Sequence, residues 1–189
     1  MEALIVLGII IIGCIAVIGA IIGIYNTLIT LKNQTKNAYA QIEVQLKRRH
    51  DLIPNLIECV KGYMQHESQT LENVTKARMV AMNMSGDAKT QSVSENVLSN
   101  ALKSLFAVSE NYPDLKASQN FLNLQEELTS TENKISFARQ FYNDSVMNYD
   151  TKKEIFPNNI IVGMFNFPSF TMFEIEDAKE REVVEVSFN

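Results

Sequence analysis

The chain has 189 residues, of which 46% are apolar and 21% are charged, and its net charge is −5. Two cysteines and two histidines are too few for a disulfide scaffold or a structural zinc site, and the acidic balance argues against a general nucleic-acid binder. The mean hydropathy of −0.05 is typical of a soluble protein, but the apolar residues are unevenly distributed along the chain.

No charged residue lies between Ala3 and Ile24. As a helix this stretch is about 33 Å long, enough to cross a hydrocarbon core of about 30 Å. Met1–Glu2 lacks the basic residues of a cleaved signal peptide, and the apolar run continues past Cys14, where a mature lipoprotein turns polar. We therefore expect residues 1–25 to be an uncleaved transmembrane anchor with the lipid bilayer as its first partner.

The charges that flank the anchor predict its orientation. Only Glu2 precedes it, whereas Lys32 and Lys36 follow it. The positive-inside rule then places the N-terminus outside and the body in the cytosol, as in a single-pass protein of the bacterial inner membrane. Cys14 and Cys59 show no pairing pattern, which agrees with a reducing compartment for the body.

Small residues recur on one side of the anchor. Gly19 and Gly23 form a GxxxG motif, and Ala16 and Ala20 form a second pair with the same spacing. Such residues let two helix backbones approach closely in lipid, so they predict a homo-oligomer. The alternative is that glycine is simply common in membrane helices.

Residues 26–156 are predicted to form a cytosolic helical bundle. Between Tyr25 and Phe156 the helix breakers are only Gly62, Gly86, Pro54 and Pro113, which indicates long helices. We expect the anchor helix to continue into the bundle, to kink at Pro54 and to stop at the turn-forming residues 84–87. The fold class is all-α: an antiparallel bundle of three helices, or four if Pro54 splits the first.

Apolar or small side chains follow one another at helical spacing along this first helix, in a heptad-like, coiled-coil stripe. The stripe comprises Leu28, Leu31, Thr35, Ala38, Ile42, Leu46, Arg49, Ile53, Leu56, Val60 and Met64. Arg49 interrupts it and requires a partner.

The starts of two further helices can also be predicted. Ser92 and Glu95 have the spacing of a capping box that opens a second helix, and Pro113 suits a first helical position before a third helix over 114–150.

Residues 157–189 differ from the body, being apolar at first and acidic at the end. Residues 158–167 look too irregular for a helix and too apolar for a free linker. Four aromatic residues form a candidate oligomer or docking surface, unless they pack back on the bundle: Phe165, Phe167, Phe170 and Phe173. Residues Glu182–Phe188 could form an edge strand or a docking peptide.

Six ionisable residues lie on or beside the helical stripes and are predicted to pair between helices and fix their alignment. They are Arg49, Glu67, Arg78, Glu110, Glu132 and Arg139. We expect no catalytic, cofactor-binding or metal-binding residue. Neither His50 nor His66 has the glutamate three residues earlier that di-iron bundles use, and the sequence has no glycine-rich phosphate loop.

Several motifs, in this order, resemble the LemA family of bacterial membrane proteins. They are Tyr25-Asn26, residues 41–56 (QIEVQLKRRHDLIPNL), Val60-Lys61-Gly62-Tyr63, His66-Glu67, Ala77-Arg78, residues 110–117 (ENYPDLKA), Leu124–Leu128, Thr131–Ile135, Ala138-Arg139, Tyr142-Asn143 and Phe156-Pro157. The resemblance covers about residues 25–168. It implies a single-pass inner-membrane protein with a helical bundle in the cytosol, and it brings no enzymatic activity.

The function we expect is architectural. Three features suit a membrane-bound scaffold that self-associates and has no catalytic activity. They are the GxxxG motif of the anchor, the helical bundle continuous with the anchor and the Phe-rich segment after it. The alternative is a regulatory or signalling subunit in a hetero-complex with other membrane proteins, in which Pro54 and Gly62 would form the moving element. No nucleic-acid partner is expected.

Overall fold

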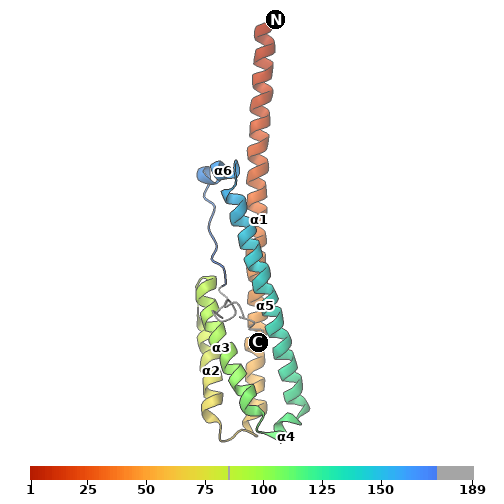
Figure 1. Ribbon diagram of the computed structural model, residues 1–189, viewed down its shortest axis with the longest axis vertical. Helices are drawn as coiled ribbons and strands as arrows, with labels where there is room; N and C mark the ends of the chain where they lie inside the picture. The colour runs from red at the N-terminus through yellow and green to blue at the C-terminus, as the bar shows by residue number, and fades with distance from the viewer. Residues whose placement is uncertain (85, 174–189) are drawn as a thin grey trace, which may run out of the picture. The chain divides into compact units, whose positions relative to one another are not determined.

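The computed structural model describes residues 1–84 and 86–173, and the regular secondary structure in these ranges is entirely helical (Figure 1). The helices are α1 (Glu2–Lys61), α2 (Ser68–Asn83), α3 (Ala88–Ser109), α4 (Pro113–Lys116), α5 (Gln119–Glu154) and α6 (Asn158–Met164). The predicted all-α class is confirmed. The strand or docking peptide expected at Glu182–Phe188 lies outside the described residues.

Helix α1 contains the uncharged stretch and continues without interruption to Lys61. In the described part of the chain it is the one helix long and apolar enough to cross a membrane, and the most apolar window of α1 has no buried residue. Pro54 lies inside α1 and does not end it. The break comes at Gly62, where residues 62–67 form turns before α2 begins.

The expected end of the first helix at residues 84–87 is therefore wrong. Gly62 has a low helix propensity, and the turn after it lets the chain reverse while Met64 stays fully buried. Every residue of the predicted stripe except the half-buried Leu31 is buried, but its last position, Met64, lies beyond the helix.

Contacts divide the chain into two compact units, which we call unit 1 (Met1–Ala40 with Gln140–Phe170) and unit 2 (Gln41–Arg139 with the described residues from Thr171). In unit 2, α2 and α3 form a helical hairpin (Figure 1). The core of unit 2 is a cluster of buried apolar side chains from α1 to α5, which comprises Ile53, Leu56, Val60, Met64, Val74, Ala77, Ala81, Leu98, Leu102, Leu105, Leu115, Phe121 and Leu128.

Two predicted helix starts need correction. Helix α3 begins at Ala88, because the Asp87 carboxylate caps it by accepting a hydrogen bond from the Thr90 backbone N–H at 3.0 Å. Ser92 and Glu95 thus lie inside α3 instead of opening it. Pro113 does occupy a first helical position, but α4 ends at Lys116 and α5 begins at Gln119, so the third helix is not continuous.

Unit 1 pairs the α1 segment that follows the uncharged stretch with the end of α5. The Tyr39 and Tyr142 rings pack with centroids 5.5 Å apart, and the Thr35 hydroxyl donates to the Ser145 carbonyl at 3.3 Å. Contrary to expectation, part of the segment after Pro157 is helical. Helix α6 forms because Ile161 is buried on one side and the Asn158 side chain donates to the Lys152 carbonyl at 2.8 Å.

Candidate functional site

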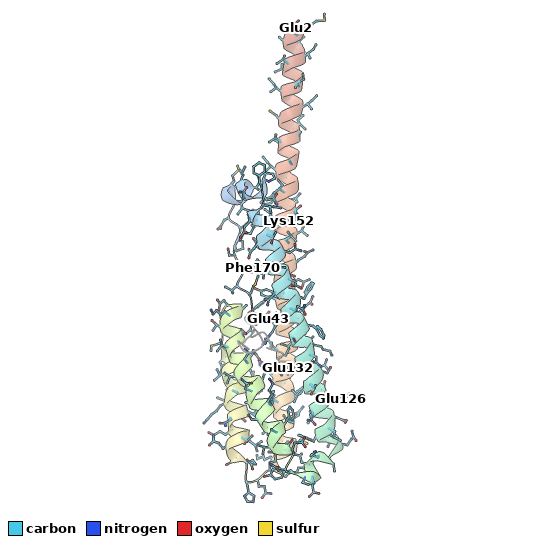
Figure 2. The ribbon with its side chains drawn as sticks, viewed as in Figure 1. Glu2, Glu43, Glu126, Glu132, Lys152 and Phe170 are labelled. Atoms are coloured by element: carbon cyan, nitrogen blue, oxygen red, sulfur yellow. The ribbon has the colours of Figure 1, made fainter. Side chains whose placement is uncertain are left out.

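The most polar part of the interior is a cluster around Arg49 in unit 2, which we call the Arg49 centre. Arg49 lies on α1 with a fully buried side chain. Its guanidinium donates to the carboxylates of Glu95 on α3 and Glu132 on α5, and Nη1 also donates to the Ser99 hydroxyl at 2.8 Å. Glu132 is labelled in Figure 2. One side chain thus joins three helices.

The Glu95 carboxylate is as buried as the guanidinium it binds. Burial opposes its ionisation, but the close contact with His50 and the charge of Arg49 outweigh that effect and hold the pKa of Glu95 below its usual 4.5. The Glu95 Oε1 atom lies 3.0 Å from Nε2 of the buried His50. The Glu132 carboxylate, in contrast, is 44% exposed, so the Arg49 centre reaches solvent on the α5 side.

Helix α2 joins the same region through the backbone of α1. Pro54 has no N–H, so the carbonyl of His50, four residues earlier, lacks its normal helical donor. Arg78 Nε supplies the missing hydrogen bond, donating to the His50 carbonyl at 2.7 Å. Arg78 therefore compensates for the N–H group that Pro54 lacks.

The structure brings Arg49 and Glu132 together, whereas the other four ionisable residues predicted to pair between helices have different partners. Glu67 accepts a hydrogen bond from the Tyr112 hydroxyl at 3.3 Å. Burial of the Tyr112 hydroxyl, and to a smaller extent the negative charge of Glu67, raise the pKa of Tyr112 above 10.0.

The partners of Glu110 and Arg139 differ from those of the Arg49 centre. Glu110 pairs with Lys116 at the surface. Arg139 donates to the Asn96 side-chain oxygen at 3.2 Å and lies 5.4 Å from the centre of the Phe173 ring.

Sequence reasoning missed Glu95, His50 and Ser99 as parts of the Arg49 centre. The spacing of Glu95 from Ser92 fits a capping box and predicts a position at a helix start rather than in the interior. The signal that could have found it is periodicity: Glu95 lies one turn before Leu98 and two turns before Leu102, on the face of α3 that is buried.

The residues predicted for packing in the membrane are all exposed along α1: Ala16, Gly19, Ala20 and Gly23. The four Phe residues divide between the units. In unit 1, Phe165 and Phe167 lie against the Tyr25 ring, at centroid distances of 5.0 and 5.8 Å, and Phe170 packs on Tyr149 at 5.4 Å. Phe173 is buried in unit 2. Their packing back onto the fold is thus observed, although Phe165 remains 43% exposed.

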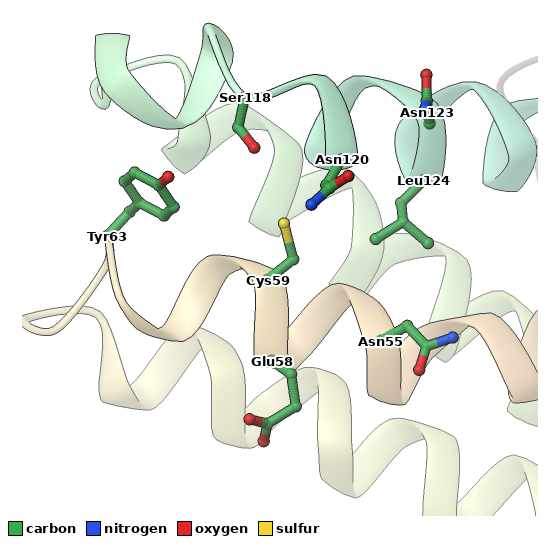
Figure 3. A pocket seen from close by; sticks show the side chains of 8 residues that line it. All are labelled: Asn55, Glu58, Cys59, Tyr63, Ser118, Asn120, Asn123 and Leu124. Carbon is green, nitrogen blue, oxygen red and sulfur yellow. The ribbon is translucent and has the colours of Figure 1, made fainter.

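Unit 2 also has an open surface hollow of about 530 Å³ between α1 and the start of α5. Figure 3 shows the Cys59 thiol directed toward Asn120, whereas the Glu58 carboxylate points away from it. The remaining lining residues are Asn55, Tyr63, Ser118, Asn123 and Leu124. Three of the eight lining residues are asparagines, and the one carboxylate among them, Glu58, is directed away from the thiol that it would have to deprotonate.

The chemistry that the Arg49 centre offers is structural. The Nη1 and Nη2 groups of its guanidinium donate to two carboxylates and a hydroxyl on neighbouring helices and so link α1, α3 and α5, whereas its buried Nε has no hydrogen-bond partner among the described residues. Within residues 1–84 and 86–173, no three His, Cys, Asp or Glu side chains converge in a way that could hold a metal ion.

Comparison with known proteins gives consistent matches. The sequence model of the LemA family matches residues 38–188. Protein LemA of Metamycoplasma hominis is 27% identical over 158 residues, which cover 82% of this chain and 72% of the relative. Magnetosome proteins MamQ 1 and MamQ 2 of Paramagnetospirillum magneticum are each 20% identical over 195 residues, covering 90% of this chain and 72% of each relative. The resemblance seen in the sequence is confirmed, and the chain belongs to the LemA family.

Proposed function

We propose that the chain is a single-pass, membrane-anchored scaffold that self-associates at the membrane surface and has no catalytic activity of its own. One observation carries this proposal. The helix that presents an exposed, uncharged stretch from Ala3 to Ile24 also supplies Arg49 and the core residues Ile53, Leu56 and Val60 of unit 2. A folded body built on its own anchor helix suits a structural role at the bilayer.

Self-association is supported by the space around the small residues of the anchor. A Cβ built at Gly19 or Gly23 meets nothing within 4 Å in this single chain. Such a face can accept the backbone of a second helix closely, and close packing, rather than hydrophobicity, drives helix association in lipid.

The test uses the full chain in mild detergent and in nanodiscs, with the mass measured by light scattering. We expect a mass that is a multiple of 21.4 kDa. The variants Gly19→Leu and Gly23→Leu block the close approach and should shift the population toward the monomer.

The control is Cys14→Leu, which places the same leucine side chain on the opposite side of α1, because each residue turns the helix by about 100°. It should leave the mass unchanged. A wild-type protein that is monomeric in both media, or glycine variants that behave as the control does, would contradict self-association. A single dominant partner recovered by affinity purification would instead favour a regulatory subunit.

The orientation that we propose has the bundle in the cytosol beneath the bacterial inner membrane, supported by Lys32 and Lys36 just past the uncharged stretch. A C-terminal fusion to alkaline phosphatase should then be inactive, and a fusion to green fluorescent protein should fluoresce. The reverse pattern would overturn this orientation.

A further inference from the structure

The segment after α5 is unusual in remaining apolar and exposed. From Ile155 to Phe173 the sequence has no charged residue. Within it, Phe156 is 78% exposed, Ile160 55% and Met164 66%, and these three follow one another at intervals of four residues. Ile161 and Asn158 point elsewhere and are buried. The turn before α6 and α6 itself thus present an exposed apolar surface, which we call the α6 surface.

Unit 1 places the α6 surface at the end of the candidate membrane span. Phe165 and Phe167, just after α6, contact the ring of Tyr25, the first residue past Ile24. Along α1 every residue from Ile9 to Ala20 is exposed, whereas Ile21, Ile24 and Tyr25 are half-buried. In Figure 1, α6 lies beside this part of α1. The covered part of α1 therefore begins in its last uncharged turns.

The surrounding residues match a membrane boundary. Tyrosine is enriched where hydrocarbon meets water. Basic side chains follow in the same unit: Lys32 on α1, and Lys152, labelled in Figure 2, in the last turn of α5. Exposed apolar groups at the depth of the headgroups, with lysines on the aqueous side, are the pattern of an interfacial element on an anionic lipid surface.

We propose that the α6 surface is a second membrane contact, in which Phe156, Ile160 and Met164 insert into the leaflet where the anchor ends. This rests on the proposed membrane anchoring of α1. The occupant is lipid rather than a second protein copy, because the same unit holds the surface against the boundary of the span through the Tyr25 ring contacts.

The test labels single cysteines with an environment-sensitive fluorophore in the full chain, in a Cys14→Ala, Cys59→Ser background. The chain is reconstituted in vesicles of phosphatidylcholine and phosphatidylglycerol that carry nitroxide-labelled lipids. The test position is Ile160→Cys. Ile18→Cys reports on the span, and Phe141→Cys is an exposed control in unit 1, about 21 Å along α5 from Ile155.

We expect the Ile160→Cys label to emit at shorter wavelength than the Phe141→Cys label and to lose most of its emission to nitroxides near the headgroup. The Ile18→Cys label should respond most to nitroxides deep in the acyl chains. If the Ile18→Cys label is quenched and the Ile160→Cys label is not, the α6 proposal is wrong while the anchor stands. A blue-shifted but unquenched Ile160→Cys label would show a protein cover, such as a second copy, and would also overturn it. Loss of quenching at Ile18→Cys would overturn the anchor itself.

Discussion

The two units differ in the polar and aromatic contacts that join their helices. Unit 2 buries a guanidinium and a carboxylate in direct contact, Arg49 and Glu95, whereas unit 1 packs aromatic rings against one another around Tyr25, Tyr142 and Tyr149. A buried ion pair adds little net stability but is costly to break, so it constrains how helices align. Aromatic pairs contribute mainly through the apolar area they bury, with a smaller gain from edge-to-face geometry. We therefore expect the largest single effect where that ion pair is broken, in unit 2.

The largest effect should come from removing Arg49. Arg49→Leu leaves the buried Glu95 carboxylate without its cation, which costs about 3–5 kcal/mol for pairs of this kind. Hydrogen exchange of the α3 amides in detergent should show this loss, while the amides of α6 in unit 1 keep their protection. The double variant Arg49→Leu/Glu95→Leu should recover most of the protection of the α3 amides, because it removes the unpaired buried carboxylate together with the cation. A single variant with wild-type protection in α3 would show that the ion pair does not constrain unit 2.

Acid should weaken unit 2 through Glu95. Because the folded-state pKa lies below 4.5, the stabilisation is fully present above pH 4.5 and is lost as the pH falls through the folded-state value. The denaturant midpoint of the wild type should therefore approach that of Glu95→Gln as the pH falls below 4.5. A constant difference between the two proteins across this range would contradict the assignment.

Alkali should weaken unit 1 through Tyr149. Its phenol donates to the Pro168 carbonyl at 3.0 Å, and burial, followed by the charge of Asp150, raises its pKa above 10.0. The stabilisation is present below pH 10.0 and is lost as the pH rises through the folded-state value. Tyr149→Phe should lower the local stability of residues 165–170 by about 1 kcal/mol at neutral pH, measured by their amide exchange. The variant should also abolish the loss of protection that the wild type shows as the pH rises above 10.0, which we call the alkaline step.

Tyr112→Phe is the matched control for the alkaline experiment. The pKa of Tyr112 shifts in the same direction, but its hydroxyl binds Glu67 in unit 2. This variant should leave the alkaline step at residues 165–170 in place. If it removes that step, the step does not originate in Tyr149.

The smallest effect should come from an exposed ion pair two residues from Arg49. Lys47 and Asp51 lie 3.1 Å apart with side chains 77% and 60% exposed. Lys47→Ala should change the free energy of unfolding by no more than about 0.5 kcal/mol, measured by the denaturant midpoint. An effect as large as that of Arg49→Leu would mean that burial does not distinguish the two pairs.

Much of this architecture could be predicted from the sequence, because helical periodicity reports burial directly. Thr35, Ala38, Ile42, Leu46 and Ile53 are buried as the stripe on α1 requires. Helix ends were less predictable. Asp87 and Ser92 are both good capping residues, and the structure uses Asp87.

The sequence indicates that Arg49 needs a partner, but the identity of that partner was harder to predict. The interruption of an apolar stripe by Arg49 indicates a buried cation, but it does not say which helix supplies the anion. The position of Glu132 beside an apolar stripe predicts that it pairs between helices, whereas the spacing of the more buried Glu95 from Ser92 predicts a capping role instead. Arg78 bonds a backbone carbonyl, and no pattern of acidic residues could have indicated that partner.

The hydrogen bond from Arg78 to the His50 carbonyl has a consequence for how the sequence can change over time. Pro54 has no N–H to donate to the His50 carbonyl of α1, and the Arg78 side chain on α2 donates to that carbonyl instead. A relative that replaces the proline regains an N–H for that carbonyl and no longer needs the arginine, whereas a relative that loses only the arginine leaves the carbonyl unsatisfied. Replacement of the proline therefore opens a route by which the arginine can be lost, and the two positions are coupled in inheritance although they lie on different helices.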